Sequence, residues 1–277
     1  TPHRALLKGT GVPDEEMGDR EILLLDRMRT VISLRGEHNF KLPGGLGAKA
    51  VLYGENHSLP SGTRWTTDER EEDLPADVGW LVGAEGSLYG YGPFNHINLY
   101  LRFATGLAAY DELGIPFGLD SDKKSAGAQE LLMGLSANHE FGETLGLLVG
   151  AYGRYFKDAD PNVYDRDDAW EAAFALRPAW YITEHFHLLG EVNLQYLRPN
   201  GISPETDRHE TPLAFQVGIM PALSLGKGSY SRPQLRLIYA LNDGALHTFA
   251  PEDPQRDQRL RHFLGFSVEW WFHSSRY

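Results

Sequence analysis

Period-two alternation of apolar and polar residues recurs in eleven segments of this 277-residue chain. Such alternation is expected of a β-strand whose two faces meet different solvents. The segments have about eight to fifteen residues, whereas strands of soluble sheets typically have roughly five or six. A strand of this length can cross a bilayer at a tilt. The segments are Asp26–His38, Gly47–Gly54, Gly79–Tyr89, His96–Leu107, Gln129–Glu140, Leu145–Phe156, Asp168–Ile182, Phe186–Leu197, Thr211–Leu223, Arg232–Asn242 and Arg261–Phe272.

The final segment, Arg261–Phe272, indicates which solvents the two faces meet. One face is aliphatic in its middle and aromatic at its end, and the opposite face carries Ser267 and Glu269. This is typical of a strand with lipid outside, an aromatic girdle at the interface and a wet interior. Trp170, Trp180, Trp270 and Phe272 are accordingly expected in the girdle.

The connections between the segments alternate between short and long along the whole chain. Outer-membrane barrels join their strands in this way, with short periplasmic turns and longer extracellular loops. The sequence therefore predicts an all-β fold, an antiparallel transmembrane β-barrel over residues 25–272. The short connections are Asn39–Leu46, Gly90–Asn95, Phe141–Thr144, Thr183–His185 and Ser224–Ser231, and the long ones are Glu55–Val78, Ala108–Ala128, Lys157–Asp167, Arg198–Glu210 and Asp243–Leu260.

Composition excludes several other classes of protein. The chain has no cysteine, which rules out disulfides and Cys-based zinc sites. It has no run of eighteen apolar residues that could form a transmembrane helix. A net charge of −12 argues against a nucleic-acid partner. No nucleophile motif stands out, so the chain is not expected to be an enzyme.

An odd number of strands cannot close an antiparallel barrel with both termini in the periplasm. The sequence therefore holds an unrecognised strand, or the chain is part of a larger barrel. Residues 1–24 are turn-rich and are interpreted as an extracellular loop or a plug, and residues 273–277 as a tail. No signal peptide precedes Thr1, so the chain is expected to be mature or to begin internally.

Several short motifs resemble those of the maltoporins, the sugar-specific porins of the Gram-negative outer membrane. The resemblance keeps its order over Arg27–Phe272 and implies the last eleven of eighteen barrel strands. It also implies facilitated diffusion of sugars or oligosaccharides, a homotrimer, and contact with outer-membrane lipid and lipopolysaccharide. The motifs are Gly79-Trp80-Leu81, Phe94-Asn95, Leu176-Arg177-Pro178, Tyr230-Ser231-Arg232-Pro233 and Val268-Glu269-Trp270-Trp271-Phe272.

Maltoporin-like channels guide sugars along a path of aromatic rings, on which the apolar faces of pyranoses stack. The resemblance places Phe94, Tyr230 and Trp271 on this path, with Tyr230 replacing a tryptophan. The period-two pattern also turns Trp271 inward. For Phe94 and Tyr230, which fall in short turns, an alternative role is to anchor the interface.

Arginines and glutamates recur on the polar side of the strands. They could donate hydrogen bonds to sugar hydroxyls or accept them, or they could brace the wall as ion pairs between neighbouring strands. Arg236 matches an arginine of the maltoporins, and the resemblance therefore makes it the first candidate for a sugar-binding residue among them. The residues concerned are Arg102, Arg154, Arg177, Arg236, Glu85, Glu171, Glu191 and Glu269.

No metal or cofactor is expected. His185, His187 and Glu191 share one face, but they straddle a turn and do not form the compact ligand set that zinc prefers. Two other functions stay open: a general or other-solute porin without sugar selectivity, and a non-transport barrel such as an adhesin, a receptor or a polysaccharide export pore.

Overall fold

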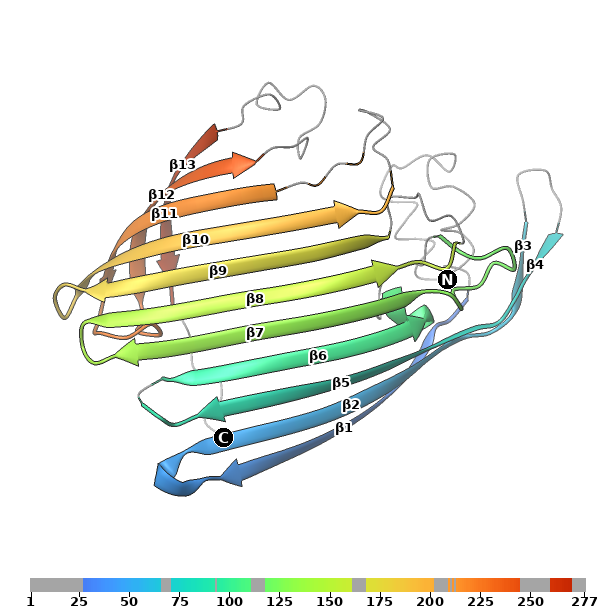
Figure 1. Ribbon diagram of the computed structural model, residues 1–277, viewed down its shortest axis with the longest axis horizontal. Helices are drawn as coiled ribbons and strands as arrows, with labels where there is room; N and C mark the ends of the chain where they lie inside the picture. Colours follow the sequence, from blue (N-terminus) through green and yellow to red (C-terminus); the bar gives the residue numbers. More distant parts are fainter. Residues whose placement is uncertain are drawn as a thin grey trace.

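The computed structural model describes residues 27–65, 71–92, 94–110, 118–160, 168–201, 209, 211, 213–244 and 260–270. Its main feature is one antiparallel sheet of eleven strands, in which each strand pairs with its neighbours along the chain (Figure 1). The eleven predicted strands are all present in the predicted order. They are β1 (Thr30–Lys41), β2 (Gly47–Leu59), β5 (Asp77–Tyr89), β6 (His96–Gly106), β7 (Gln129–Phe141), β8 (Leu145–Lys157), β9 (Ala169–Tyr181), β10 (Phe186–Pro199), β11 (Leu213–Ser224), β12 (Gln234–Gly244) and β13 (Leu260–Glu269).

The sheet is rolled into an open trough, with β11–β13 turned away from the plane of β6–β9 (Figure 1). Its two edges are β1 and β13, which are not paired with each other in the part of the chain described. An unpaired edge leaves a row of backbone N–H and C=O groups without partners, and hydrocarbon cannot satisfy them. In a membrane both edges therefore need partner strands.

Short and long connections alternate as predicted. The turns β1–β2, β5–β6, β7–β8, β9–β10 and β11–β12 all lie at one end of the sheet, which we call the short-turn end. The first of them contains a 3₁₀ turn, η1 (Pro43–Gly45), with a left-handed backbone at Gly44 (φ 78°) that glycine adopts at little cost. The longer connections leave and rejoin the sheet at the opposite end, which we call the long-loop end.

The structure corrects some boundaries at the long-loop end. The segment predicted to stop at Gly54 extends to Leu59, and β5 begins at Asp77 rather than Gly79. Between them a second sheet pairs β3 (Gly62–Trp65) with β4 (Glu71–Leu74), inside a connection predicted to be a loop. The pairing of β2 and β5 thus continues beyond their alternating residues, where the apolar pattern that predicts strands is absent. Within the described residues no helix is long and apolar enough to span a bilayer.

The connection after β6 folds back into the trough as the 3₁₀ turn η2 (Leu107–Tyr110), whose four residues are all buried. Its Tyr110 ring meets the Phe156 ring of β8 edge-on, with centroids 5.4 Å apart. Gly79 of β5 allows this approach, because a Cβ there would lie 2.1 Å from the backbone nitrogen of Ala108. The trough is therefore packed with protein at its long-loop end.

Candidate functional site: the polar concave face

The two faces of the sheet differ in chemistry. The outer face carries large apolar side chains that are mostly solvent-exposed in the isolated chain, including Leu34 (80%), Leu264 (72%) and Phe266 (69%). The opposite face carries the arginines, glutamates and amides. This polar face is concave, because side chains of β7 contact the β11–β12 turn across it although β8, β9 and β10 lie between them in the sheet.

Exposed tryptophans lie near both ends of the outer face. Trp80 and Trp170 lie at the long-loop ends of β5 and β9, and Trp180 and Trp270 lie at the short-turn end. Two aromatic belts flanking an apolar band are typical of strands that cross a bilayer. This arrangement agrees with the girdle predicted for Trp170, Trp180 and Trp270, to which Trp80 is added, while Phe272 lies outside the described residues.

A row of alternating charges crosses four strands on the concave face. Glu130 of β7, which is 1% exposed, pairs with Arg102 of β6 and with Nε of Arg154 on β8 at 2.7 Å. Arg154 continues the row to Glu171 of β9 at 3.3 Å. The sign of the charge therefore alternates from strand to strand across β6, β7, β8 and β9. Such ion pairs between neighbouring strands brace the wall, and they also fix the orientation of the guanidinium groups.

Amide side chains extend a second polar row toward β12. Arg177 of β9 pairs with Glu191 of β10, whose other carboxylate oxygen accepts a hydrogen bond from Asn193 at 2.7 Å. Asn193 also donates to Gln216 of β11 at 2.6 Å, and Gln216 donates to Asn242 of β12 at 2.6 Å. Amides both donate and accept hydrogen bonds, so this row matches the hydrogen-bonding capacity of sugar hydroxyls.

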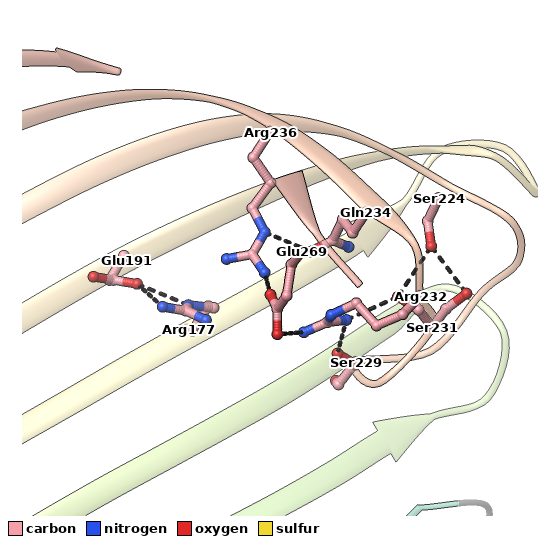
Figure 2. Close-up of polar contacts among 9 residues, drawn as sticks. All are labelled: Arg177, Glu191, Ser224, Ser229, Ser231, Arg232, Gln234, Arg236 and Glu269. Carbon is pink, nitrogen blue, oxygen red and sulfur yellow. Dashed lines mark hydrogen bonds and ion pairs between the residues drawn. The ribbon is translucent and has the colours of Figure 1, made fainter. Parts of the chain in front are cut away.

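Figure 2 shows a third group, at the short-turn end, where Glu269 of β13 receives two guanidinium groups. One belongs to Arg236 of β12 and the other, at 3.0 Å, to Arg232 of the β11–β12 turn. Gln234 orients Arg236 by accepting a hydrogen bond from its Nε at 2.6 Å. Burial, and secondly the charge of Arg177, lower the pKa of the Arg232 guanidinium.

The aromatic residues predicted for a sugar path meet at the same end. Phe94, in the β5–β6 turn, and Tyr230, in the β11–β12 turn, lie with their ring centroids 6.1 Å apart. The His96 ring lies 6.0 Å from Tyr230. Phe94 is 57% exposed, so part of its ring surface is free to contact a solute. Burial raises the pKa of the Tyr230 hydroxyl, which therefore stays protonated and can donate a hydrogen bond. Trp271 lies outside the described residues.

A strand-rich trough of this kind is consistent with many barrels, and the comparison with known families decides among them. The family model described as LamB porin matches residues 36–272. The chain belongs to the LamB porin family. Its members are channels for sugars in the outer membrane of Gram-negative bacteria, and they are not enzymes. No curated protein sequence compared with the chain matches it.

Membership of the LamB porin family confirms the resemblance to maltoporins, and the structure shows which predicted residues lie together. Arg177, Arg236 and Glu269 gather at the short-turn end with Phe94 and Tyr230, whereas Arg102 belongs to the row at the long-loop end. Glu85 of β5 lies 4.0 Å from Arg35 of β1.

Two charged residues of these networks, Glu130 and Arg232, were not among the predicted site residues. Neither was Glu140 of β7, whose carboxylate accepts a hydrogen bond of 2.9 Å from the Ser229 nitrogen of the β11–β12 turn. Glu130 and Glu140 share the polar parity of Asn138, so extending the alternation of β7 to both of its ends would have found them. Arg232 was predicted to open a strand, but it lies in the turn before β12. Among the described residues, no group of three His, Asp or Glu side chains could hold a metal ion. His185 and His187 are hydrogen-bonded to the backbone oxygens of Ser224 and Glu184.

Proposed function

We propose that sugars cross the outer membrane along the concave face, stacking on Phe94, Tyr230 and Trp271. The observation that carries this proposal is the Phe94–Tyr230 pair, in which two turns distant in sequence bring their rings to 6.1 Å beside a polar network. A pyranose has an apolar face for such rings and hydroxyls for the polar groups around them. Weak, repeated contacts of this kind let a solute both bind and leave.

The charged residues supply the hydrogen bonds of this path in the same proposal. Glu269 links Arg236 to Arg232, which lies in the same turn as Tyr230. Arg177 pairs with Glu191 on the neighbouring strand, and Arg102 serves the long-loop end. Their ion pairs keep the side chains in place and leave further donor and acceptor atoms for a passing hydroxyl. Support for this role is their placement on the wet face.

The assembly around the channel is proposed on the same basis. The exposed apolar outer face fits lipid acyl chains and, in the outer leaflet, lipopolysaccharide. The short turns are assigned to the periplasm and the long loops to the cell exterior. Residues 1–24 are assigned to an extracellular loop or a plug, and residues 273–277 to a tail. A homotrimer is proposed from the family.

Block of the ion current by linear oligosaccharides in planar bilayers tests the aromatic path. Tyr230→Ala is expected to weaken the block roughly threefold to tenfold, the contribution of one aromatic stacking contact. Trp170→Ala, on the outer face, serves as the control and should leave it unchanged. A current that no sugar blocks, in any variant, would favour a general porin without sugar selectivity.

A further inference from the structure

The β11–β12 turn, residues 225–233, leaves the wall and folds over the concave face. Its Ser229 nitrogen donates a hydrogen bond of 2.9 Å to Glu140 of β7, and its Ser229 hydroxyl lies 3.4 Å from the hydroxyl of Tyr181 on β9. Lys227 of the turn pairs with Glu143 of the β7–β8 turn at 3.1 Å. The turn therefore spans the width of β8, β9 and β10.

Glu140 is the centre of this attachment. Besides Ser229, its carboxylate accepts hydrogen bonds from the Tyr181 hydroxyl at 2.7 Å and from the Asn138 amide at 3.3 Å. A carboxylate that accepts a backbone N–H is a strong hydrogen-bonding partner. Among the described residues no lysine or arginine forms an ion pair with Glu140. The Ser229 nitrogen of the turn is one of the hydrogen-bond donors to its carboxylate.

Contacts of Arg232 and Tyr230 also hold the turn in place. Arg232 donates to the backbone oxygens of Ser229 and Ser231, at 3.1 Å and 2.8 Å, and its guanidinium pairs with Glu269 of β13. The Tyr230 ring contacts the ring of Phe94, which lies in the β5–β6 turn. The turn is thus held at both sides of the trough, as Figure 2 shows for its Arg232 side.

We propose that residues 225–233 form a bar across the short-turn opening of the pore, and that this bar limits the width of the solute that can pass. Glu140 is its positioning residue. This inference rests on the proposed function, since it assumes that solutes move along the concave face. The solutes it excludes are wide or branched oligosaccharides, whatever their affinity for the aromatic path.

Two glycines of β8 provide a matched pair of variants. A Cβ at Gly146 would lie 2.2 Å from the Tyr181 hydroxyl and 2.7 Å from both the Glu140 carboxylate and the Ser229 hydroxyl. It would push the bar away from its attachment. Gly150, on the same strand and the same concave face, has no atom within 4 Å of its Cβ position. Gly146→Ala should therefore release the bar, and Gly150→Ala should not.

The test is the size limit for uncharged polyethylene glycols, measured as polymer exclusion from the single-channel current in planar bilayers. Gly146→Ala and Glu140→Gln are expected to raise the conductance and shift the exclusion limit to larger polymers, whereas Gly150→Ala should match the unsubstituted chain. An unchanged limit in both Gly146→Ala and Glu140→Gln would overturn the proposal. Because these polymers and ions need no sugar site, the outcome is independent of the oligosaccharide block.

Labelling of a single cysteine reports on the bar directly. The chain has no cysteine of its own, so Ser229→Cys introduces one reactive thiol, and the Ser229 nitrogen can still bond Glu140. A water-soluble maleimide is expected to label it faster when Gly146→Ala is added than when Gly150→Ala is added. Equal labelling rates would show that the bar is not displaced and would contradict the proposal.

Discussion

Glu130 shows how a single residue organises the concave wall. Its side chain is nearly inaccessible and contacts two arginines from the strands on either side of β7. A buried carboxylate is costly unless it is paired, and here both oxygens are. Removing its charge would weaken the contacts with Arg102 and Arg154 together, one on each side of β7.

Glu130→Gln is expected to lower the free energy of unfolding by on the order of 2 kcal/mol, because it breaks a largely buried ion pair. Urea unfolding of the chain in lipid vesicles measures this change. The control is Glu37→Gln, whose partner Arg35 is 56% exposed. An exposed pair contributes about 0–1 kcal/mol. Equal losses in the two variants would mean that Glu130 has no special place in the wall.

At the scale of elements, a close backbone approach holds the β6–β7 connection inside the trough. Gly79 of β5 lies against the backbone of Leu107 and Ala108 in η2, and Arg29 donates a hydrogen bond to the Leu107 oxygen at 2.9 Å. Only a residue without a Cβ fits there unless the backbone of η2 shifts. The packing of η2 therefore depends on one glycine of a strand.

Gly79→Ala should destabilise the fold by about 1–3 kcal/mol, the usual effect of overpacking a tight site. The same urea titration gives the value. Gly86→Ala, farther along β5, is the control because nothing lies within 4 Å of its Cβ position. If Gly86→Ala lowered the free energy of unfolding as much as Gly79→Ala, the cause would be strand propensity and not the packing of η2.

The strands were predictable because period-two alternation depends only on which neighbours a side chain meets above and below the sheet. Leu237 and Arg236, for example, were assigned to opposite faces from their parity alone, and the structure places them so. The β3–β4 hairpin and the inward folding of residues 225–233 were not predictable in this way. Both depend on contacts between distant segments, such as Ser229 with Glu140, which leave no periodic signal in the sequence.

The candidate site was predictable to a similar degree. Membership of the concave face followed from alternation, as with Arg177 and Glu191 on neighbouring strands. The partner of each arginine could not be predicted from alternation, because it depends on the register between strands and on the side-chain conformations. The Phe94–Tyr230 contact joins two turns, and in the sequence it was marked only by the resemblance to maltoporins.

For the whole molecule, a membrane-spanning barrel requires lipid on the outer face of the sheet and water on the concave face. Leu237→Arg on the outer face is expected to destabilise the chain in vesicles by about 2–4 kcal/mol, the cost of an arginine near the bilayer midplane. Gln216→Arg on the concave face should cost much less, because its side chain meets water. The comparison uses unfolding in the same lipid, and similar losses at the two positions would argue against a lipid-facing outer wall.

The most direct measurement is the accessibility of spin labels on single cysteines, at Leu237 on the outer face and at Gln216 on the concave face, with the chain in lipid vesicles. The chain's lack of cysteine makes each label unique. The account predicts that the label at Leu237 collides mainly with oxygen dissolved in the lipid, and that the label at Gln216 collides mainly with a water-soluble nickel complex. A label at Leu237 that neither reagent reaches, as in a dry protein interior, would contradict it.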